Sequence, residues 1–237
     1  MPTNISDLII MENIADSFNA DRYYLSKREQ KLTNNILKVS RAAEKLSGLG
    51  INYVNSTMLY GESGTGKTTY GRYLAYKLGV PFAYMTFAKL IDSKLGQTQK
   101  NINNVFEYIK ELNCVFMIDE IDAIAKKRGM DSEVGEMARI VIGLIQNLDE
   151  LHNGVVLLGA TNRIDVIDEA VLRRFSRKHE VIRLDKDERF NLVNTFISNV
   201  EGYSISSVSM NRLATVEATQ ADLMHRIVML MVDEFSA

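Results

Sequence analysis

The sequence predicts an α/β fold in which a doubly wound parallel sheet is followed by a small domain of helices. Apolar runs of strand length alternate with segments of helical periodicity, and their centres lie near Met58, Ala83, Val115, Val156 and Val181. This alternation is typical of a parallel sheet whose two faces are covered by helices through right-handed crossovers. Beyond residue 185 the pattern is helical throughout, over residues 190–200, 210–215 and 219–235.

These patterns divide the chain into three parts: an N-terminal helical segment (1–50), a large α/β domain (51–185) and a small helical domain (186–237). Residues 26–48 are predicted to form one helix, with Ser26 as its N-cap and Gly48 as its stop signal. Before it, the spacing of apolar residues from Ile5 to Phe18 predicts an amphipathic helix. This helix would pack either on the core of the chain itself or on a partner.

The composition disfavours a general nucleic-acid binder and a membrane protein. The chain carries 28 Lys and Arg against 30 Asp and Glu, so it lacks the basic excess that holds a polyanion over a broad surface. It shows no apolar run of membrane-spanning length and no secretory signal, and its single cysteine, Cys114, excludes an intrachain disulfide. We therefore expect a cytoplasmic protein with no membrane partner.

The strongest motif follows the first strand of the predicted sheet. Residues 61–68 read GESGTGKT and match the pattern G-x-x-x-x-G-K-[ST], the Walker A motif of P-loop nucleoside triphosphatases. Glycines let successive backbone N–H groups point at phosphate oxygens, and the helix that follows adds the positive end of its dipole. Lys67 is expected to reach the β- and γ-phosphates of ATP, and Thr68 to offer its hydroxyl to Mg²⁺. The expected nucleotide contacts are Gly61, Glu62, Ser63, Gly64, Thr65, Gly66, Lys67, Thr68 and Thr69.

Two acidic residues end another strand-like run. Residues 114–118 are apolar throughout, as in a strand that is buried on both faces, and Asp119 and Glu120 follow directly. Asp119 is the predicted second metal contact, usually through water, and Glu120 is the group expected to orient and deprotonate an attacking water. Cys114 lies within the run and is interpreted as a core residue.

Four segments in this order, GESGTGKTT, VFMIDEIDA, GATNR and LRRFSR, resemble the AAA family of ATPases within the wider AAA+ group. The resemblance extends from about Val54 to the C-terminus. It implies a P-loop ATPase core with a C-terminal helical lid and Mg²⁺-dependent ATP hydrolysis. It also implies that Asn162 holds the attacking water together with Glu120, a task that suits an amide because it both donates and accepts.

The resemblance further implies that Arg174 and Arg177 are arginine fingers, which reach the γ-phosphate held by a neighbouring subunit. A guanidinium is permanently charged and forked to fit phosphate, so it stabilises charge that develops during transfer. The alternative for Arg174 is a solvated basic rim with intrachain ion pairs to Asp168 or Glu169.

The same resemblance implies that the chain forms a homo-oligomeric ring, and a hexamer is the expected state. The chain is similar to small stand-alone bacterial AAA ATPases, some of which are encoded beside a peptidase, so a protein partner, such as a peptidase, is expected. Lys94, Leu95 and Gly96 stand where the first pore loop has an aromatic, an apolar residue and glycine, which weakens the case for threading by an aromatic grip.

Two other functions stay open. One is a DNA-associated AAA+ ATPase with a basic lining from Lys94, Lys126, Lys127 and Arg128, although nucleic acid is the less favoured partner. The other is a scaffold whose assembly is gated by ATP.

Two further pairs of residues concern the nucleotide site: one departs from the family pattern, and the other is expected to lie beside the adenine. Glu62 and Ser63 stand where many members have two prolines, and the carboxylate of Glu62 is expected to point outward, away from phosphate. Tyr24 and Leu25 are the candidate adenine contacts that the resemblance implies.

Overall fold

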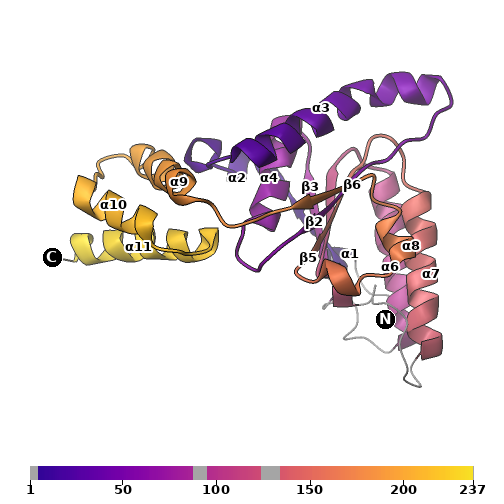
Figure 1. Ribbon diagram of the computed structural model, residues 1–237. Helices are drawn as coiled ribbons and strands as arrows, with labels where there is room; N and C mark the ends of the chain where they lie inside the picture. Colours follow the sequence, from indigo (N-terminus) through magenta and orange to yellow (C-terminus); the bar gives the residue numbers. More distant parts are fainter. Residues whose placement is uncertain (1–4, 88–94, 124–133, 237) are drawn as a thin grey trace.

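The computed structural model describes residues 5–87, 95–123 and 134–236, and a six-stranded sheet forms its centre (Figure 1). The strands lie in the order β1-β3-β4-β5-β2-β6, and all neighbours are parallel except β1, which is antiparallel to β3. The strands are β1 (Ile10–Glu12), β2 (Asn55–Tyr60), β3 (Phe82–Thr86), β4 (Val115–Asp119), β5 (Val156–Thr161) and β6 (Arg177–Glu180). The predicted doubly wound parallel sheet is therefore confirmed, with one antiparallel strand added at its edge.

Helices cover both faces of this sheet (Figure 1). One face packs against α3 (Lys27–Gly48) and α4 (Lys67–Leu78), and the other against α6 (Leu95–Lys110), α7 (Val134–Asp149) and α8 (Glu169–Leu172). Successive residues of β4 alternate between the two cores, so that Val115 and Met117 face α4 while Phe116 and Ile118 face α6. This two-sided burial explains why the strand sequences are apolar without interruption.

The prediction of one amphipathic helix between Ile5 and Phe18 is wrong. The structure divides this segment into α1 (Ile5–Leu8), strand β1 and α2 (Ile14–Ser17). Leu8 and Ile9 join the core on one face of the sheet, whereas Ile14 joins the core on the other face. A single helix could not reach both faces, because the sheet lies between them. The segment packs on the chain's own core, at the edge of the sheet.

The helix predicted over residues 26–48 is confirmed as α3, and the Ser26 hydroxyl accepts a hydrogen bond from the backbone N–H of Glu29. The helical pattern beyond residue 185 is also confirmed, as α9 (Lys186–Ser198), α10 (Ser207–Thr215) and α11 (Gln220–Phe235). These last helices enclose a core of their own around Val193, Leu223 and Ile227. Within the described ranges, the helices lack the combination of length and apolar character that crossing a bilayer requires.

Candidate functional site

A cavity of about 480 Å³ lies at the carboxyl ends of the parallel strands. Its walls come from regions that are distant in sequence: the loop after β2 with the start of α4, the residues that precede and begin α3, the ends of β4 and β5, the link after β6, and helices α9 and α11. Lys67, Thr68, Asp119, Glu120 and Asn162 all contribute to its lining. The structure thus brings together the predicted phosphate, metal and water contacts in one place.

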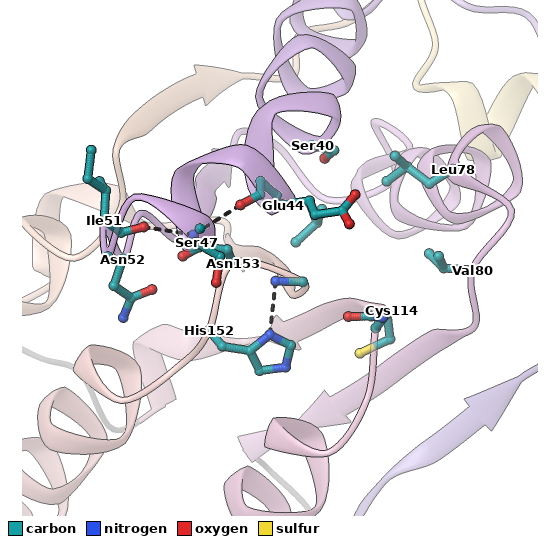
Figure 2. Close-up of a pocket in the computed structure, with 16 residues that line it drawn as sticks. Ser40, Glu44, Ser47, Ile51, Asn52, Leu78, Val80, Cys114, His152 and Asn153 are labelled. Carbon is teal, nitrogen blue, oxygen red and sulfur yellow. Dashed lines mark hydrogen bonds between the residues drawn. The ribbon is translucent and has the colours of Figure 1, made fainter.

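A larger cavity, about 890 Å³, opens at the other end of the sheet, beside the starts of β4 and β5 and the last turns of α3 (Figure 2). Polar side chains that line this cavity hold the surrounding loops together. The Asn153 side chain donates to Ile51 O at 2.9 Å and accepts from the backbone N–H of Tyr53 at 2.8 Å, while His152 Nδ1 accepts from the backbone N–H of Gly154 at 2.9 Å. The predicted site residues do not line it.

The loop after β2 approaches its neighbours so closely that glycine is required at two positions. Gly61 has φ 141° and Gly64 has φ 79°, both in the region that side chains disfavour. A Cβ on Gly61 would collide with the carbonyl oxygen of Val181, and one on Gly64 would come within 2.8 Å of Thr219 Oγ1. The close approach lets the backbone N–H of Ala221 donate to Gly64 O at 3.0 Å, which joins the loop to the start of α11.

Lys67 is a buried cation whose hydrogen bonds all go to neutral oxygens. Its Nζ donates to Gly61 O (2.8 Å), to Glu62 O (2.9 Å) and to Asn162 Oδ1 (2.8 Å). Burial lowers the pKa of Lys67, and the nearby carboxylates, Asp119 foremost, oppose this shift. A desolvated ammonium held by dipoles at the wall of a cavity fits a phosphate group, which supplies the full negative charge that those dipoles lack.

The residues around Thr68 fit a hard divalent cation. The Thr68 hydroxyl donates to Asp119 Oδ2 at 3.2 Å, and the Tyr84 hydroxyl donates to the same oxygen at 3.1 Å. The other carboxylate oxygen, Asp119 Oδ1, accepts from the backbone N–H of Glu120 at 2.8 Å. A hydroxyl and a carboxylate side by side are oxygen donors of the kind that Mg²⁺ takes in small number from a protein.

Glu120 has an unusual backbone conformation for its residue type. Its φ is 52°, and among the described residues it is the one non-glycine residue with a positive φ. Such a conformation costs about 1–3 kcal/mol and occurs mainly where function requires it. The hydroxyl of Thr86, on the neighbouring strand β3, donates to Glu120 Oε2 at 3.0 Å.

The candidate arginine fingers lie outside this cavity. Arg174 makes a forked ion pair with Asp149 at the end of α7, with distances of 3.0 and 2.9 Å. Arg177 lies in β6 and donates to Asn55 Oδ1 at 2.8 Å. Asp168 and Glu169, the expected ion-pair partners of Arg174 in a solvated basic rim, make other contacts. Glu169 pairs with Arg173, and Asp168 accepts from the backbone N–H of Ala170. Arg174 thus has an intrachain ion pair, but to Asp149.

The carboxylate of Glu62 points outward, as predicted. It is about half exposed and makes a forked ion pair with Arg183, 2.7 Å at both oxygens, which lowers the pKa of Glu62. Of the two candidate adenine contacts, Tyr24 lines the cavity, whereas Leu25 packs against the core beside α4. Lys94, Lys126, Lys127 and Arg128 lie outside the described residues.

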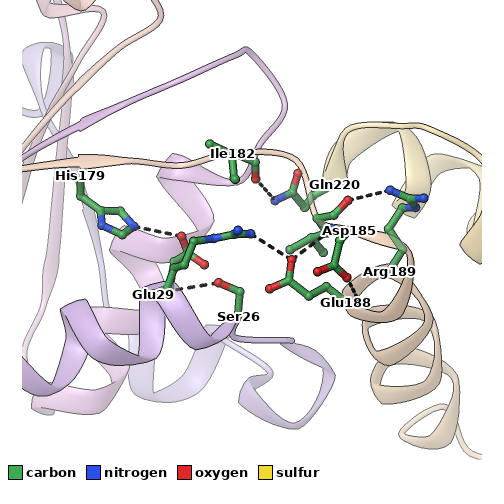
Figure 3. Close-up of polar contacts among 10 residues, drawn as sticks. Ser26, Glu29, His179, Ile182, Asp185, Glu188, Arg189 and Gln220 are labelled. Atoms are coloured by element: carbon green, nitrogen blue, oxygen red, sulfur yellow. Dashed lines mark hydrogen bonds and ion pairs between the residues drawn. The ribbon is translucent and has the colours of Figure 1, made fainter.

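Polar contacts connect the sheet, α3 and the C-terminal helices beside the cavity (Figure 3). Glu29 accepts from His179 Nε2 at 3.0 Å, and Arg28 pairs with Glu188 of α9 at 2.9 Å. The Gln220 amide donates to Ile182 O, in the link between β6 and α9, at 3.2 Å. Sequence reasoning missed the cavity residues from α9 and α11, such as Phe196, Gln220 and Met224. The motif after β2 gave no signal for them, because their place at the cavity depends on how the C-terminal helices pack beside the loop after β2.

Comparison with known proteins returns one family model and several relatives. The model described as ATPase family associated with various cellular activities (AAA) matches residues 57–183, more than half of the chain. A protein named uncharacterized AAA family ATPase y4kL, from Sinorhizobium fredii, is 31% identical over 178 residues, which cover 75% of this chain and 53% of that protein.

Two other relatives have names that mention proteolysis. The ATP-dependent zinc metalloprotease FtsH of Lachnoclostridium phytofermentans is 36% identical over 159 residues, 64% of this chain and 28% of that protein. A proteasome-activating nucleotidase of Methanococcus maripaludis is 33% identical over 175 residues, 70% of this chain and 43% of that protein. The chain therefore spans about half, or less, of the length of these relatives.

Proposed function

Because the chain belongs to the AAA family of ATPases and hydrolyses ATP, we propose that it uses Mg²⁺ in this reaction and couples it to the remodelling of a protein partner as a homo-oligomer. The observation that carries the proposal is the convergence of Lys67, Thr68, Asp119, Glu120 and Asn162 on one cavity. The names of the metalloprotease and the proteasome-activating nucleotidase support a polypeptide as the partner, with a peptidase as one candidate.

Lys67 binds the phosphate chain of ATP in this proposal. Exchange of Asn162 Oδ1 for a phosphate oxygen replaces a dipole by a charged partner, which strengthens the hydrogen bond to Lys67. The same exchange frees the amide of Asn162, which can then hold the attacking water. Gly64 and Gly66 are proposed to present backbone N–H groups to the remaining phosphate oxygens.

Glu120 is the proposed general base. The hydroxyl of Thr86 holds its carboxylate at the end of β4, and exchange of this contact for the attacking water would put Glu120 in reach of the proton it accepts. Thr68 and Asp119 are the proposed metal contacts, and Mg²⁺ bound there would supply Lewis-acid stabilisation of charge on the phosphoryl group.

Arg174 is proposed to complete the site of a neighbouring subunit, and hexamer is the proposed state of the ring. Its position outside the chain's own cavity supports this role, because a finger that acts between subunits must face outward. The forked pair with Asp149 lies partly exposed to solvent, and in water such a pair is weak enough to exchange for phosphate. A finger of this kind contributes roughly 10³–10⁵ in rate.

Mixing two inactive variants tests the action between subunits. Arg174→Ala removes the finger and keeps the pocket, whereas Lys67→Ala removes the pocket and keeps the finger. Each alone is expected to lose ATP turnover, and a mixture is expected to recover part of it, because some interfaces pair an intact pocket with an intact finger. Arg173→Ala is the matched control, since Arg173 is exposed and pairs with Glu169; it should behave as wild type. If the mixture stays inactive at every ratio although it assembles, the finger does not act between subunits.

The partner class is tested separately, by stimulation of ATP turnover. An unfolded acidic polypeptide such as casein is expected to stimulate, and double-stranded DNA is not. Stimulation by DNA that falls steeply with salt, with no response to polypeptide, would instead support the DNA-associated alternative.

A further inference from the structure

Tyr84 is a polar residue of the sheet that the ATPase motifs do not include, and it contacts a motif residue. It lies in β3, which runs parallel to β4 with Thr86 opposite Asp119, so Tyr84 and Asp119 are diagonal neighbours on one face. Diagonal neighbours are separated by more than the reach of a short side chain, but a tyrosine spans the distance. Its hydroxyl donates to Asp119 Oδ2 at 3.1 Å.

The carboxylate of Asp119 is fixed by three donors, and Tyr84 differs from the other two. The backbone N–H of Glu120 is an adjacent peptide group, and the hydroxyl of Thr68 is itself a proposed metal contact. Of these three donors, Tyr84 is the one whose role can be solely to orient the carboxylate of Asp119. Without it the carboxylate keeps two of its three donors, and its last torsion angle, which is broad for sp³–sp² bonds, is less tightly restrained.

Tyr84 is in turn supported by the edge of the sheet. Strand β1 pairs with β3 so that Ile10 lies opposite Tyr84. Glu12, also in β1, makes a forked ion pair with Arg72 of α4, 2.8 Å at both oxygens. The guanidinium of Arg72 lies over the ring of Phe82 at 5.5 Å, and that ring is 6.2 Å from the ring of Tyr84. The N-terminal strand therefore packs around the tyrosine that holds Asp119.

We propose that Tyr84 is a positioning residue for the metal site: its hydroxyl holds Asp119 Oδ2 in the orientation in which Asp119 and Thr68 bind Mg²⁺. The proposal rests on the proposed metal contacts but not on any partner or ring. Groups that orient a metal ligand typically contribute 10–100-fold to metal affinity. Loss of the hydroxyl should therefore weaken Mg²⁺ binding without weakening the contacts of Lys67 with phosphate.

Tyr84→Phe removes this hydroxyl and keeps the ring. The measurement is the affinity for a fluorescent ATP analogue, first in EDTA and then over a series of Mg²⁺ concentrations. Wild-type and variant protein should bind equally in EDTA, and the variant should need about 10-fold more Mg²⁺ for the same gain in affinity. Turnover should recover at high Mg²⁺. Tyr73→Phe is the matched control, because it removes the hydroxyl of a buried tyrosine in α4 that does not line the cavity, and it should leave the Mg²⁺ dependence unchanged.

Three outcomes contradict the proposal, each in a recognisable way. Coincident Mg²⁺ curves for wild type and Tyr84→Phe would show that the hydroxyl does not position Asp119. An equal loss of affinity in EDTA and in Mg²⁺, with a lower melting temperature, would assign Tyr84 a purely structural role. A wild-type protein whose affinity for the analogue does not respond to Mg²⁺ would overturn the proposed metal contacts, and the role of Tyr84 with them.

Discussion

Asp119 and Glu120 are adjacent in the chain, yet their carboxylates have different surroundings. Asp119 is the last residue of β4 and accepts hydrogen bonds from two hydroxyls and a peptide N–H. Glu120 leaves the strand with φ 52°, which turns its side chain toward Thr86 on the neighbouring strand. Because the backbone conformation changes between these two residues, the carboxylate of Asp119 is fixed, whereas that of Glu120 can be released to act as a base.

Glu120→Gln should separate ATP binding from hydrolysis. The amide keeps the shape of the side chain and can still contact Thr86, but it cannot accept a proton from water. Binding of ATP should stay near the wild-type level, while phosphate release should fall by about 10²–10⁴-fold, the usual contribution of a general base. Glu107→Gln, on the solvent side of α6, is the control and should leave both quantities unchanged. Wild-type turnover in Glu120→Gln would refute the assignment of the base.

At the scale of elements, the position of α4 depends on a glycine within the helix. Gly71 faces the sheet, and a Cβ there would come within 2.9 Å of Phe82 Cε2, 3.0 Å of Met117 Sδ and 3.3 Å of Leu158 Cδ1. The helix therefore lies against the strands more closely than any side chain would allow. Because α4 begins at Lys67, this contact also sets the height of the phosphate loop above the sheet.

Gly71→Ala should destabilise the protein although alanine is the better helix former. Overpacking a core typically costs about 1–3 kcal/mol, which exceeds the gain of about 0.5–1 kcal/mol from helix propensity. Gly48→Ala is the matched control, because Gly48 ends α3 and a Cβ there meets nothing within 4 Å. That variant should be as stable as wild type or slightly more stable. The check is the free energy of unfolding from denaturant titration, and equal values for the two variants would contradict the close-packing argument.

At the scale of the whole molecule, the cavity is a meeting point of parts that have separate cores. The sheet with its helices has one core on each face, and α9 to α11 enclose a third. Between them lie the hydrogen bond from Ala221 to Gly64 and the ion pair between Arg28 and Glu188. A ligand in the cavity touches all of these parts at once, so its binding should restrain their relative motion.

Hydrogen exchange should show this restraint as simultaneous protection of distant segments. A non-hydrolysable ATP analogue is expected to slow exchange of backbone amides in residues 61–69, in residues 18–24 and at the start of α11. The larger cavity near His152 provides an internal control, and exchange around it should not change. Protection confined to residues 61–69 would show that the C-terminal helices do not close on the nucleotide.

The sequence by itself determined the features that depend on local spacing. The uninterrupted apolar runs required strands buried on both faces, and the motif from Gly61 to Thr68 required a phosphate loop, because its glycines and lysine act within a few residues of one another. Ser26 marked the start of α3 for the same reason, since an N-cap bonds to a backbone group three residues away. Asp119 and Glu120 at the end of β4 and Asn162 after β5 meet at one edge because parallel strands end together, and the family resemblance had paired Asn162 with Glu120.

The tertiary structure alone decided the contacts that depend on which strands become neighbours. Leu8 and Ile14 belong to one apolar pattern in the sequence, but they lie on opposite faces because β1 pairs with the edge of β3 between them. Tyr84 meets Asp119 because β3 lies beside β4, and Gln220 reaches the cavity because the start of α11 packs against the phosphate loop, where Ala221 bonds to Gly64. No local pattern encodes these pairings, since each is set by the packing of segments that are far apart in the chain.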